Sequence, residues 1–159
     1  MRTFADSAGR QWKVELTLGA AKRIQALTGV NLLELDRGDP PLLTRLGLDV
    51  MLLCDVIFAV LEPQAEAAGV SDEQFGEALG GEAILAARTA FFEELADFFR
   101  RLGRADLARA IPAQEKLLAV AVERADRRIG EVDVEQAARQ IVGDRSLSLQ
   151  ASSESTPSP

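Results

Sequence analysis

Residues 82–102 read EAILAARTAFFEELADFFRRL, and this stretch decides the fold because it carries the clearest helical pattern in the chain. At 100° per residue, its large apolar side chains fall within one arc and most of its charged side chains fall opposite. The apolar set is Ile84, Leu85, Phe91, Phe92, Leu95, Phe98, Phe99 and Leu102; the charged set is Glu82, Glu93, Glu94, Asp97, Arg100 and Arg101. The spacing predicts an amphipathic helix with its apolar side on a core.

Arg88 is the exception in this helix, because the same arithmetic places it near the middle of the apolar arc. Its guanidinium can reach solvent along the helix surface, pair with a buried acid such as Asp55, or point into a partner-binding surface. We expect one of the first two arrangements. Replacing Arg88 with Leu separates the cases: unchanged folding with lost partner binding indicates a binding role, and lost folding indicates a structural one.

Four phenylalanines on one helix are also candidates for a partner-binding surface, because a small core does not always absorb so many rings. Trp12, near the N-terminus, is a further aromatic candidate. The complete candidate set for partner binding is Trp12, Arg88, Phe91, Phe92, Phe98 and Phe99. Core packing is the role that we expect by default for each aromatic side chain, and burial of all four Phe rings would exclude the surface that they form.

Before this helix, residues 1–16 predict a β-hairpin. Thr3–Ala5 and Arg10–Leu16 flank the turn-like residues 6–9, and the apolar side chains that alternate onto one face are Trp12, Val14 and Leu16, which Phe4 can join. An isolated hairpin is marginal in water. It therefore packs on its own helices, which we expect, or pairs with strands of another chain.

Helical patterns fill the rest of the first hundred residues. Thr17 caps a helix that ends at Gly29, with apolar residues at helical spacing: Leu18, Ala21, Ile24 and Leu27. Residues 42–61 predict a helix buried on nearly all sides and ended by Glu62-Pro63, in which Asp55 must find a partner or reach solvent. A capping box over residues 71–74 starts a short helix to about Leu79.

Beyond Gly103 the pattern predicts a brief helical turn, a helix from Pro112 closed by Gly130, and a last helix over residues 133–142. The following Ser- and Pro-rich segment predicts disorder. The fold expected is mainly α, with an N-terminal β-hairpin followed by a compact bundle of about five to seven helices. We assign one domain to residues 1–143 and a disordered tail to residues 144–159.

Composition argues against chemistry at a catalytic centre. The 159 residues contain no histidine, no tyrosine and one cysteine, Cys54, which lies in an apolar run and reads as a small core hydrophobe. Pairs of carboxylates such as Glu93 and Glu94 read as a solvated helix face. No glycine-rich phosphate loop is present. We therefore expect no catalytic residue, no metal ligand, no cofactor and no enzymatic activity.

Charge and hydropathy restrict the partners. A net charge of −7 disfavours nucleic-acid binding, which requires an excess of Lys and Arg on one surface. The longest apolar stretch, Val50 to Leu61, is too short to span a bilayer, and the N-terminus lacks the apolar core of a signal peptide. A single cysteine cannot close an intramolecular disulfide, as expected in a reducing cytoplasm, so we expect a cytoplasmic protein that binds other proteins.

Three strings carry a family resemblance: TFADSAGRQW at residues 3–12, RIQALTGVNLL at residues 23–33, and GVSDEQFG followed by ALGG within residues 69–81. Together they resemble small phage and prophage proteins of the tail module, and most of all the tail assembly chaperones. The resemblance covers about residues 1–102. Its motifs carry no chemistry, and the family supplies no catalytic residue to transfer to this chain.

What the resemblance implies is a non-enzymatic protein that keeps the long, apolar, helical tape-measure protein soluble and lets tail-tube subunits assemble around it. The tape-measure protein and the major tail-tube protein are the implied partners, and the cytoplasm of the bacterial host is the implied location. Two other interpretations stay open: a structural tail completion or connector protein retained in the virion, and a small cytoplasmic adaptor unrelated to phage.

Overall fold

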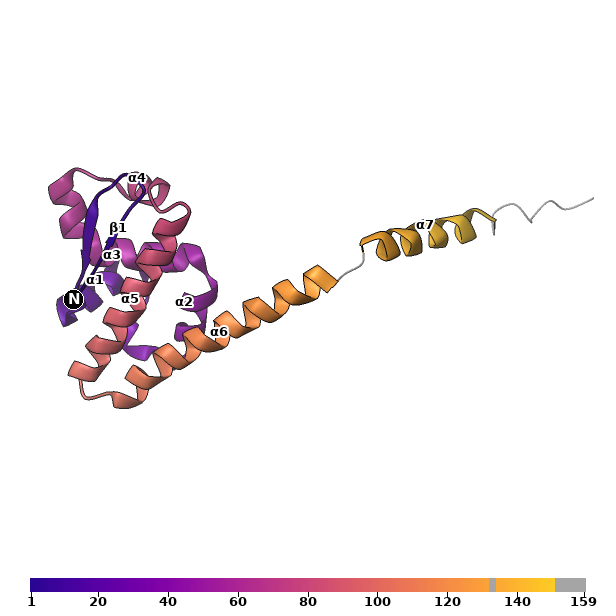
Figure 1. Ribbon diagram of the computed structural model, residues 1–159. Helices are drawn as coiled ribbons and strands as arrows, with labels where there is room; N and C mark the ends of the chain where they lie inside the picture. The colour runs from indigo at the N-terminus through magenta and orange to yellow at the C-terminus, as the bar shows by residue number, and fades with distance from the viewer. Residues whose placement is uncertain (132–133, 151–159) are drawn as a thin grey trace, which may run out of the picture. The chain divides into compact units, whose positions relative to one another are not determined.

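The computed structural model describes residues 1–131 and 134–150, with side chains described as far as residue 142. The elements in these residues are β1 (Arg2–Ala5), β2 (Gln11–Val14), α1 (Leu18–Thr28), the 3-10 helix η1 (Leu32–Glu34), α2 (Leu42–Leu48), α3 (Val50–Ala68), α4 (Asp72–Glu77), α5 (Glu82–Arg101), α6 (Ala105–Glu131) and α7 (Val134–Gln150). The predicted fold class, a β-hairpin followed by a mainly helical chain, is confirmed (Figure 1).

The chain divides into two units, residues 1–118 and residues 119 onward. The first unit contains the hydrophobic core, and Ile111 is the last buried residue of the described chain. In the second unit, residues 119–131 and 134–142 are all exposed. The division falls within α6, upstream of the domain boundary that we expect at residue 143.

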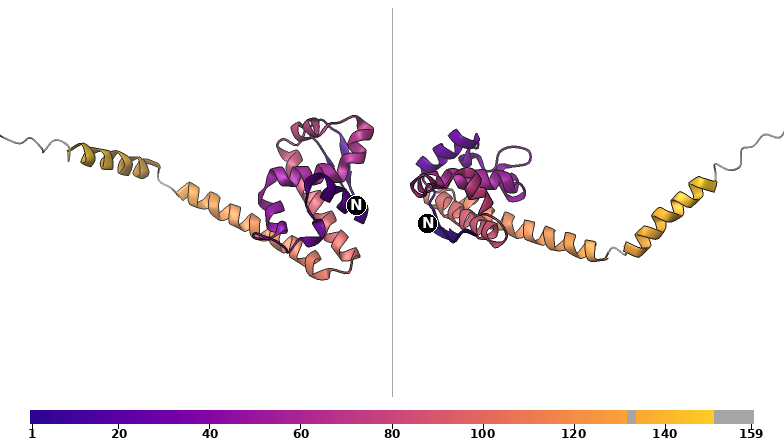
Figure 2. Two further views of the ribbon diagram at one scale, coloured as in Figure 1. Left: turned by 180° about the vertical axis from the view of Figure 1, so that it is seen from behind. Right: turned by 90° about the horizontal axis from the view of Figure 1, so that it is seen from above.

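The hairpin packs on helices of its own chain, as expected. Strands β1 and β2 pair antiparallel with Phe4 opposite Trp12, and the alternating side chains of one face are buried: Phe4, Trp12 and Val14. β1 lies against α5 and β2 lies against α3. Figure 2 shows this hairpin at the surface of the first unit from two further sides.

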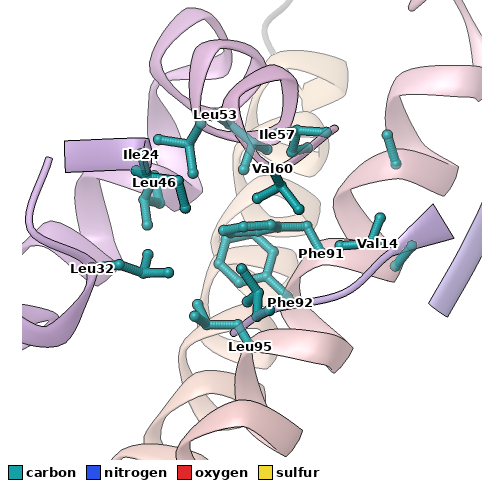
Figure 3. Close-up of a cluster of buried hydrophobic side chains, with 14 of the residues drawn as sticks. Val14, Ile24, Leu32, Leu46, Leu53, Ile57, Val60, Phe91, Phe92 and Leu95 are labelled. Atoms are coloured by element: carbon teal, nitrogen blue, oxygen red, sulfur yellow. The ribbon is translucent and has the colours of Figure 1, made fainter. Parts of the chain in front are cut away.

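The core is formed where α1, α2 and α3 meet α5 (Figure 3). Each of these helices contributes branched aliphatic or aromatic side chains that exclude water, and the fully or almost fully buried ones include Ile24, Leu46, Leu53, Ile57, Phe91, Phe92 and Leu95. Burial of this apolar area is the main force that holds the first unit together. Leu18 and Leu27, predicted on the inner face of α1, are instead about half exposed.

Several helix ends follow from the capping residues identified in the sequence. The Thr17 hydroxyl accepts a hydrogen bond from the Ala20 backbone N–H at 3.1 Å, and α1 ends at Gly29 with a left-handed φ of 73°. Ser71 and Gln74 form both hydrogen bonds of the predicted capping box at the start of α4. Local capping therefore set these boundaries.

The predicted continuous helix over residues 42–61 is wrong. The structure has two helices there, α2 and α3, separated at Asp49. The Asp49 carboxylate accepts a hydrogen bond from the Leu52 backbone N–H at 3.0 Å, so it caps the second helix. Asp49 ends α2 and also caps the first turn of α3. Hydrophobic periodicity alone does not reveal such a helix boundary.

Helix α3 also continues through Pro63 to Ala68, although Glu62-Pro63 was expected to end it. Proline has no N–H, so Pro63 leaves the carbonyl of Ala59 without its helical donor. Arg23 of α1 replaces that donor: its Nε donates to the Ala59 carbonyl at 2.7 Å and its Nη2 to the Val60 carbonyl at 3.0 Å. A side chain from another helix thus allows α3 to pass the proline.

The C-terminal helices are longer than predicted. Helix α6 runs without interruption from Ala105 to Glu131, through Pro112 and Gly130, where we expected a turn and a separate helix. Helix α7 continues through Gly143 to Gln150. Residues 144–150, which the sequence predicts as part of a disordered tail, are therefore helical, and residues 151–159 lie outside the described residues.

Candidate functional site

The aromatic candidates for partner binding are core residues. Trp12, Phe91, Phe92, Phe98 and Phe99 are each no more than 3% exposed. The rings meet one another edge to face, with centroids 5.5 Å apart for Phe91 and Phe92 and 5.4 Å apart for Phe98 and Phe99. Core packing, the role that we expect by default, is therefore the role of these rings, and the candidate aromatic partner surface is excluded.

Arg88 is also engaged within the fold. Its Nη1 donates to the Gly47 carbonyl of α2 at 2.9 Å, its Nε lies 4.0 Å from the Glu115 carboxylate of α6, and its guanidinium stacks over the Phe92 ring. The expected intramolecular pairing is present, but with Glu115 in place of Asp55. A guanidinium that joins three helices in this way serves the structure, so a role in partner binding is not supported.

Asp55 is exposed to solvent. Exposure is one of the two arrangements that we expect for this carboxylate, the other being a buried partner. Partial burial raises its pKa, and the nearby carboxylates of Asp72 and Asp49 raise it further. The neighbouring Cys54 is half-buried and packs against the core. Burial raises the pKa of its thiol, as does the charge of Asp55, so at neutral pH Cys54 is a protonated hydrophobic side chain.

Three carboxylates line a surface depression of about 450 Å³ beside Asp55. Its lining residues are Leu27, Thr28, Leu52, Asp55, Phe58, Ala59, Glu62 and Asp72. Across residues 1–131 and 134–150, no group of three or more His, Cys, Asp or Glu side chains is placed to hold a metal ion. The three carboxylates that line this depression therefore do not define a metal centre.

Among residues 1–131 and 134–142 two carboxylates are buried, and both hold the hairpin in place. Asp6 accepts hydrogen bonds from the indole Nε1 of Trp12 at 2.8 Å, from the Arg10 Nε at 2.7 Å, and from the backbone N–H groups of Ala8 and Arg10. Burial alone would raise the pKa of Asp6, but the hydrogen bonds from Trp12 and Arg10 outweigh it and lower the pKa. Asp6 therefore stabilises the hairpin turn.

Glu94 is the second buried carboxylate, and the sequence prediction of a solvated position is wrong. Its side chain is fully buried and accepts from the Met1 ammonium, from the Arg101 Nη2 at 2.9 Å and from the Leu16 backbone N–H at 3.2 Å. Burial opposes ionisation, but these donors together lower the pKa of Glu94. The sequence signal that could have indicated the burial of Glu94 is its place next to the edge of the apolar arc of α5.

Exposed apolar side chains gather on the two C-terminal helices. On α7 they lie on one face by helical spacing, and all four are exposed: Val134, Ala137, Ala138 and Ile141. Val134 is 76% exposed and Ile141 is 66% exposed. Sequence periodicity found this face but could not show that it stays uncovered, because periodicity is the same for a buried helix and an exposed one.

Comparison of the chain with protein-family models, with curated proteins and with solved structures finds no match. In the described part of the chain, no helix combines the length and the apolar character needed to cross a bilayer. The assignment of a function therefore depends on the chain's own residues and on the resemblance of its sequence strings.

Proposed function

We propose that this protein is a non-enzymatic assembly chaperone of a phage tail module, and that it binds the helical tape-measure protein and assists tail-tube assembly. The observation that carries the proposal is the exposed apolar face of α7, which is formed by Val134, Ala137, Ala138 and Ile141. The resemblance of residues 3–12, 23–33 and 69–81 to tail assembly chaperones names the partner.

The face of α7 has the geometry by which one amphipathic helix recognises another. Its four residues stand at positions i, i+3, i+4 and i+7, the spacing of the anchors that an amphipathic helix buries in an apolar groove. The two alanines in the middle leave room for close approach of a second helix, while Val134 and Ile141 supply apolar area at the ends. Binding would bury side chains that are now in water.

The first unit contributes solubility to such a complex. The chain carries a net charge of −7, and charge of one sign keeps protein assemblies apart in solution. A long apolar helix held on α7 would therefore be attached to a compact, acidic domain. This arrangement suits a chaperone that keeps an aggregation-prone partner in solution until assembly.

The test begins with sequencing of the DNA that flanks the gene, which should contain a tail-tube gene and a tape-measure gene. The tape-measure protein found there is then co-expressed with this chain, and the complex is captured on a tag. We expect Ile141→Asp to reduce the co-purified partner about tenfold, because it places a charge in an apolar contact. Gln140→Asp is the matched control, one residue away and outside the apolar face of α7.

Equal capture by Ile141→Asp and Gln140→Asp would contradict the proposed surface, provided that circular dichroism shows equal helix content in both variants. A gene neighbourhood without virion genes would contradict the proposed role in phage tail assembly. Mass spectrometry of purified particles then separates a chaperone, which should be absent from the particle, from a structural tail component, which should be present.

A further inference from the structure

The backbone of strand β2 is covered on its outer side by a side chain of α3. The Lys13 N–H donates to the Oε1 of Gln64 at 3.0 Å, and the Nε2 of Gln64 donates to the Lys13 carbonyl at 2.7 Å. Both backbone groups of Lys13 therefore point away from β1. In the antiparallel register, the residue opposite Lys13 is Thr3.

This register determines where the backbone groups of β1 point. Opposite residues of an antiparallel pair exchange either both hydrogen bonds or none, and the two kinds of pair alternate along the strands. Because Lys13 turns its groups outward, Thr3 turns its own groups outward on the other side of the hairpin, as does Ala5. The bond from the Asp6 N–H to the Arg10 carbonyl, at 3.0 Å, agrees with this alternation.

The outer edge of β1 is unpaired. Within residues 1–131 and 134–150, no hydrogen bond outside the strand pair involves the N–H or the carbonyl of Thr3. Thr3 is also exposed. An exposed strand edge with free N–H and carbonyl groups is a template for a further strand.

A depression of about 670 Å³ lies along this edge, between β1 and α5. Its lining from α5 consists of Leu85, Ala86, Thr89, Ala90 and Glu93. The side chains in the middle of this set are short, which leaves depth over the helix. Since neighbouring strands lie about 4.8 Å apart, one more strand fits beside β1 and above this part of α5.

The two ends of the depression differ in chemistry. Arg2 pairs with Glu93 at 3.3 Å. Beyond the other end of β1, the Ser7 hydroxyl donates to the Ala78 carbonyl, which precedes α5. β1 and α5 therefore run in opposite directions, so Glu93 lies beside the start of the strand and Leu85 lies nearer its end. The Glu93 side chain is 51% exposed and Leu85 is 62% exposed.

Pairing with Thr3 fixes which side chains of an added antiparallel strand face α5. One residue of that strand exchanges both hydrogen bonds with Thr3, and its side chain points away from α5. The residue before it lies opposite Phe4 and the residue after it lies opposite Arg2, and both face the helix. The first of these meets Leu85 and should be apolar. The second meets the Glu93 carboxylate and should be basic.

A second copy of β1 does not meet this requirement. Paired antiparallel through Thr3, it would place its own Arg2 on the apolar side near Leu85 and its own Phe4 beside the Glu93 carboxylate. This order is the reverse of the one that the depression favours. The occupant that fits is therefore an extended segment of a different protein.

We propose that the outer edge of β1 binds an extended peptide segment of another protein as an antiparallel third strand. The segment carries an apolar residue, then the residue that pairs with Thr3, then a basic residue. Backbone hydrogen bonds of this kind provide affinity, and alternate side chains provide specificity. The site does not include α7, so it does not depend on the proposed function.

A defined peptide tests this site on the full-length, isotope-labelled chain. The probe is the acetylated and amidated peptide Ser-Thr-Val-Thr-Lys-Thr-Ser, whose central threonine is the residue that pairs with Thr3. In an NMR titration, we expect the amide proton resonances of Thr3 and Ala5 to move downfield and to saturate, because both N–H groups gain acceptors. An absence of movement at millimolar peptide would overturn the proposal.

Variants of the peptide separate backbone pairing from other contacts. N-methylation of the central threonine removes the donor to the Thr3 carbonyl and should weaken binding about tenfold. N-methylation of the lysine is the matched control, because its N–H points away from β1. A peptide in which Val and Lys exchange places should also bind less tightly. Equal loss on both methylations, or tighter binding of the exchanged peptide, would overturn the antiparallel third strand.

Variants of the chain test the same contact from the other side. Thr3→Pro removes the outward N–H, and an edge strand tolerates proline at such a position. It should weaken binding about tenfold, whereas Thr3→Val, which keeps the N–H, should not. Circular dichroism checks that both variants fold. Equal binding by the two variants would contradict the proposal.

The charge at the end of the depression provides an independent test. Glu93→Lys should weaken binding of the lysine peptide and should strengthen binding of the same peptide with glutamate in place of lysine. An unchanged preference would contradict the assigned register. Sedimentation equilibrium without peptide tests the second copy as occupant: self-association of the wild-type chain that Thr3→Pro abolishes would overturn the proposal.

Discussion

At the scale of single residues, Glu94 shows how burial converts a surface-type side chain into a structural one. Its carboxylate joins three segments that are far apart in the sequence: the N-terminus, the end of the hairpin at Leu16 and the last turn of α5 at Arg101. Arg101 also donates to the Leu16 carbonyl at 3.1 Å. These hydrogen bonds therefore stabilise the ionised form of Glu94.

The first prediction concerns this carboxylate. Glu94→Gln should lower the free energy of unfolding at pH 7 by about 2 kcal/mol, because hydrogen bonds to a charged group are lost. The Glu94 pKa is lowered from its ordinary value of 4.5 in the folded protein, so its stabilisation is present above that value and is lost as the pH falls through the lowered pKa. Urea unfolding at pH 7 and pH 3 measures both effects.

Glu93→Gln is the control for this measurement, because Glu93 is the neighbouring residue and its side chain is 51% exposed. It should change the stability by less than about 0.5 kcal/mol at either pH. If the two variants lose equal stability at pH 7, or if the loss in Glu94→Gln grows on acidification, the role assigned to Glu94 is wrong.

At the scale of secondary-structure elements, the passage of α3 through Pro63 depends on α1. The Ala59 carbonyl has lost its helical donor to proline and receives Arg23 instead. An unpaired carbonyl in this part-buried position would cost free energy comparable to a lost hydrogen bond. The continuity of one helix is therefore stabilised by a side chain of another.

A double-mutant cycle tests this dependence. Arg23→Met should reduce the free energy of unfolding by about 1.5 kcal/mol in the chain with Pro63. In a Pro63→Ala background the same substitution should cost less, because the restored N–H of residue 63 can donate to Ala59. The other contacts of Arg23, to Val60 and to Glu62 at 3.6 Å, are lost equally in both backgrounds. Equal costs in the two backgrounds would contradict the assigned role of Arg23.

At the scale of the whole molecule, stability is concentrated in residues 1–118. The last buried side chains are Leu107, Ala108 and Ile111 in the first turns of α6. Beyond residue 118 the described side chains as far as residue 142 are exposed. Exposed helices contribute little to a cooperative core and open at low free-energy cost.

We therefore predict that a chain ending after Leu118 unfolds with a free energy within about 0.5 kcal/mol of the full chain. A chain ending after Gly103 should be strongly destabilised, because it lacks the three buried residues at the start of α6. Urea unfolding followed by tryptophan fluorescence reports on both, since Trp12 is buried in the first unit. A large loss of stability in the longer truncation would contradict the assignment of the core to residues 1–118.

The candidate site was only partly predictable from the sequence, because helical periodicity does not show which apolar faces are covered by other elements. Periodicity identified the aromatic stripe of α5, and it identified the helical spacing on α6 and α7 equally well. It could not rank these faces, because a buried stripe and an exposed one have the same pattern. Burial removed Phe91 and Phe99 from the candidate set, and exposure brought Val134 and Ile141 into it.

Sequence by itself determined the local features of this protein: the hairpin around Asp6–Gly9, the caps at Thr17 and Ser71, and the amphipathic character of α5. These depend on residues within a few positions of one another, so a local pattern is sufficient. Only the tertiary structure decided the burial of Glu94, the continuation of α3 through Pro63, and which apolar faces stay in water. Each of these depends on whether a residue dozens of positions away in the sequence makes a contact. A local pattern carries no information about contacts between residues so far apart.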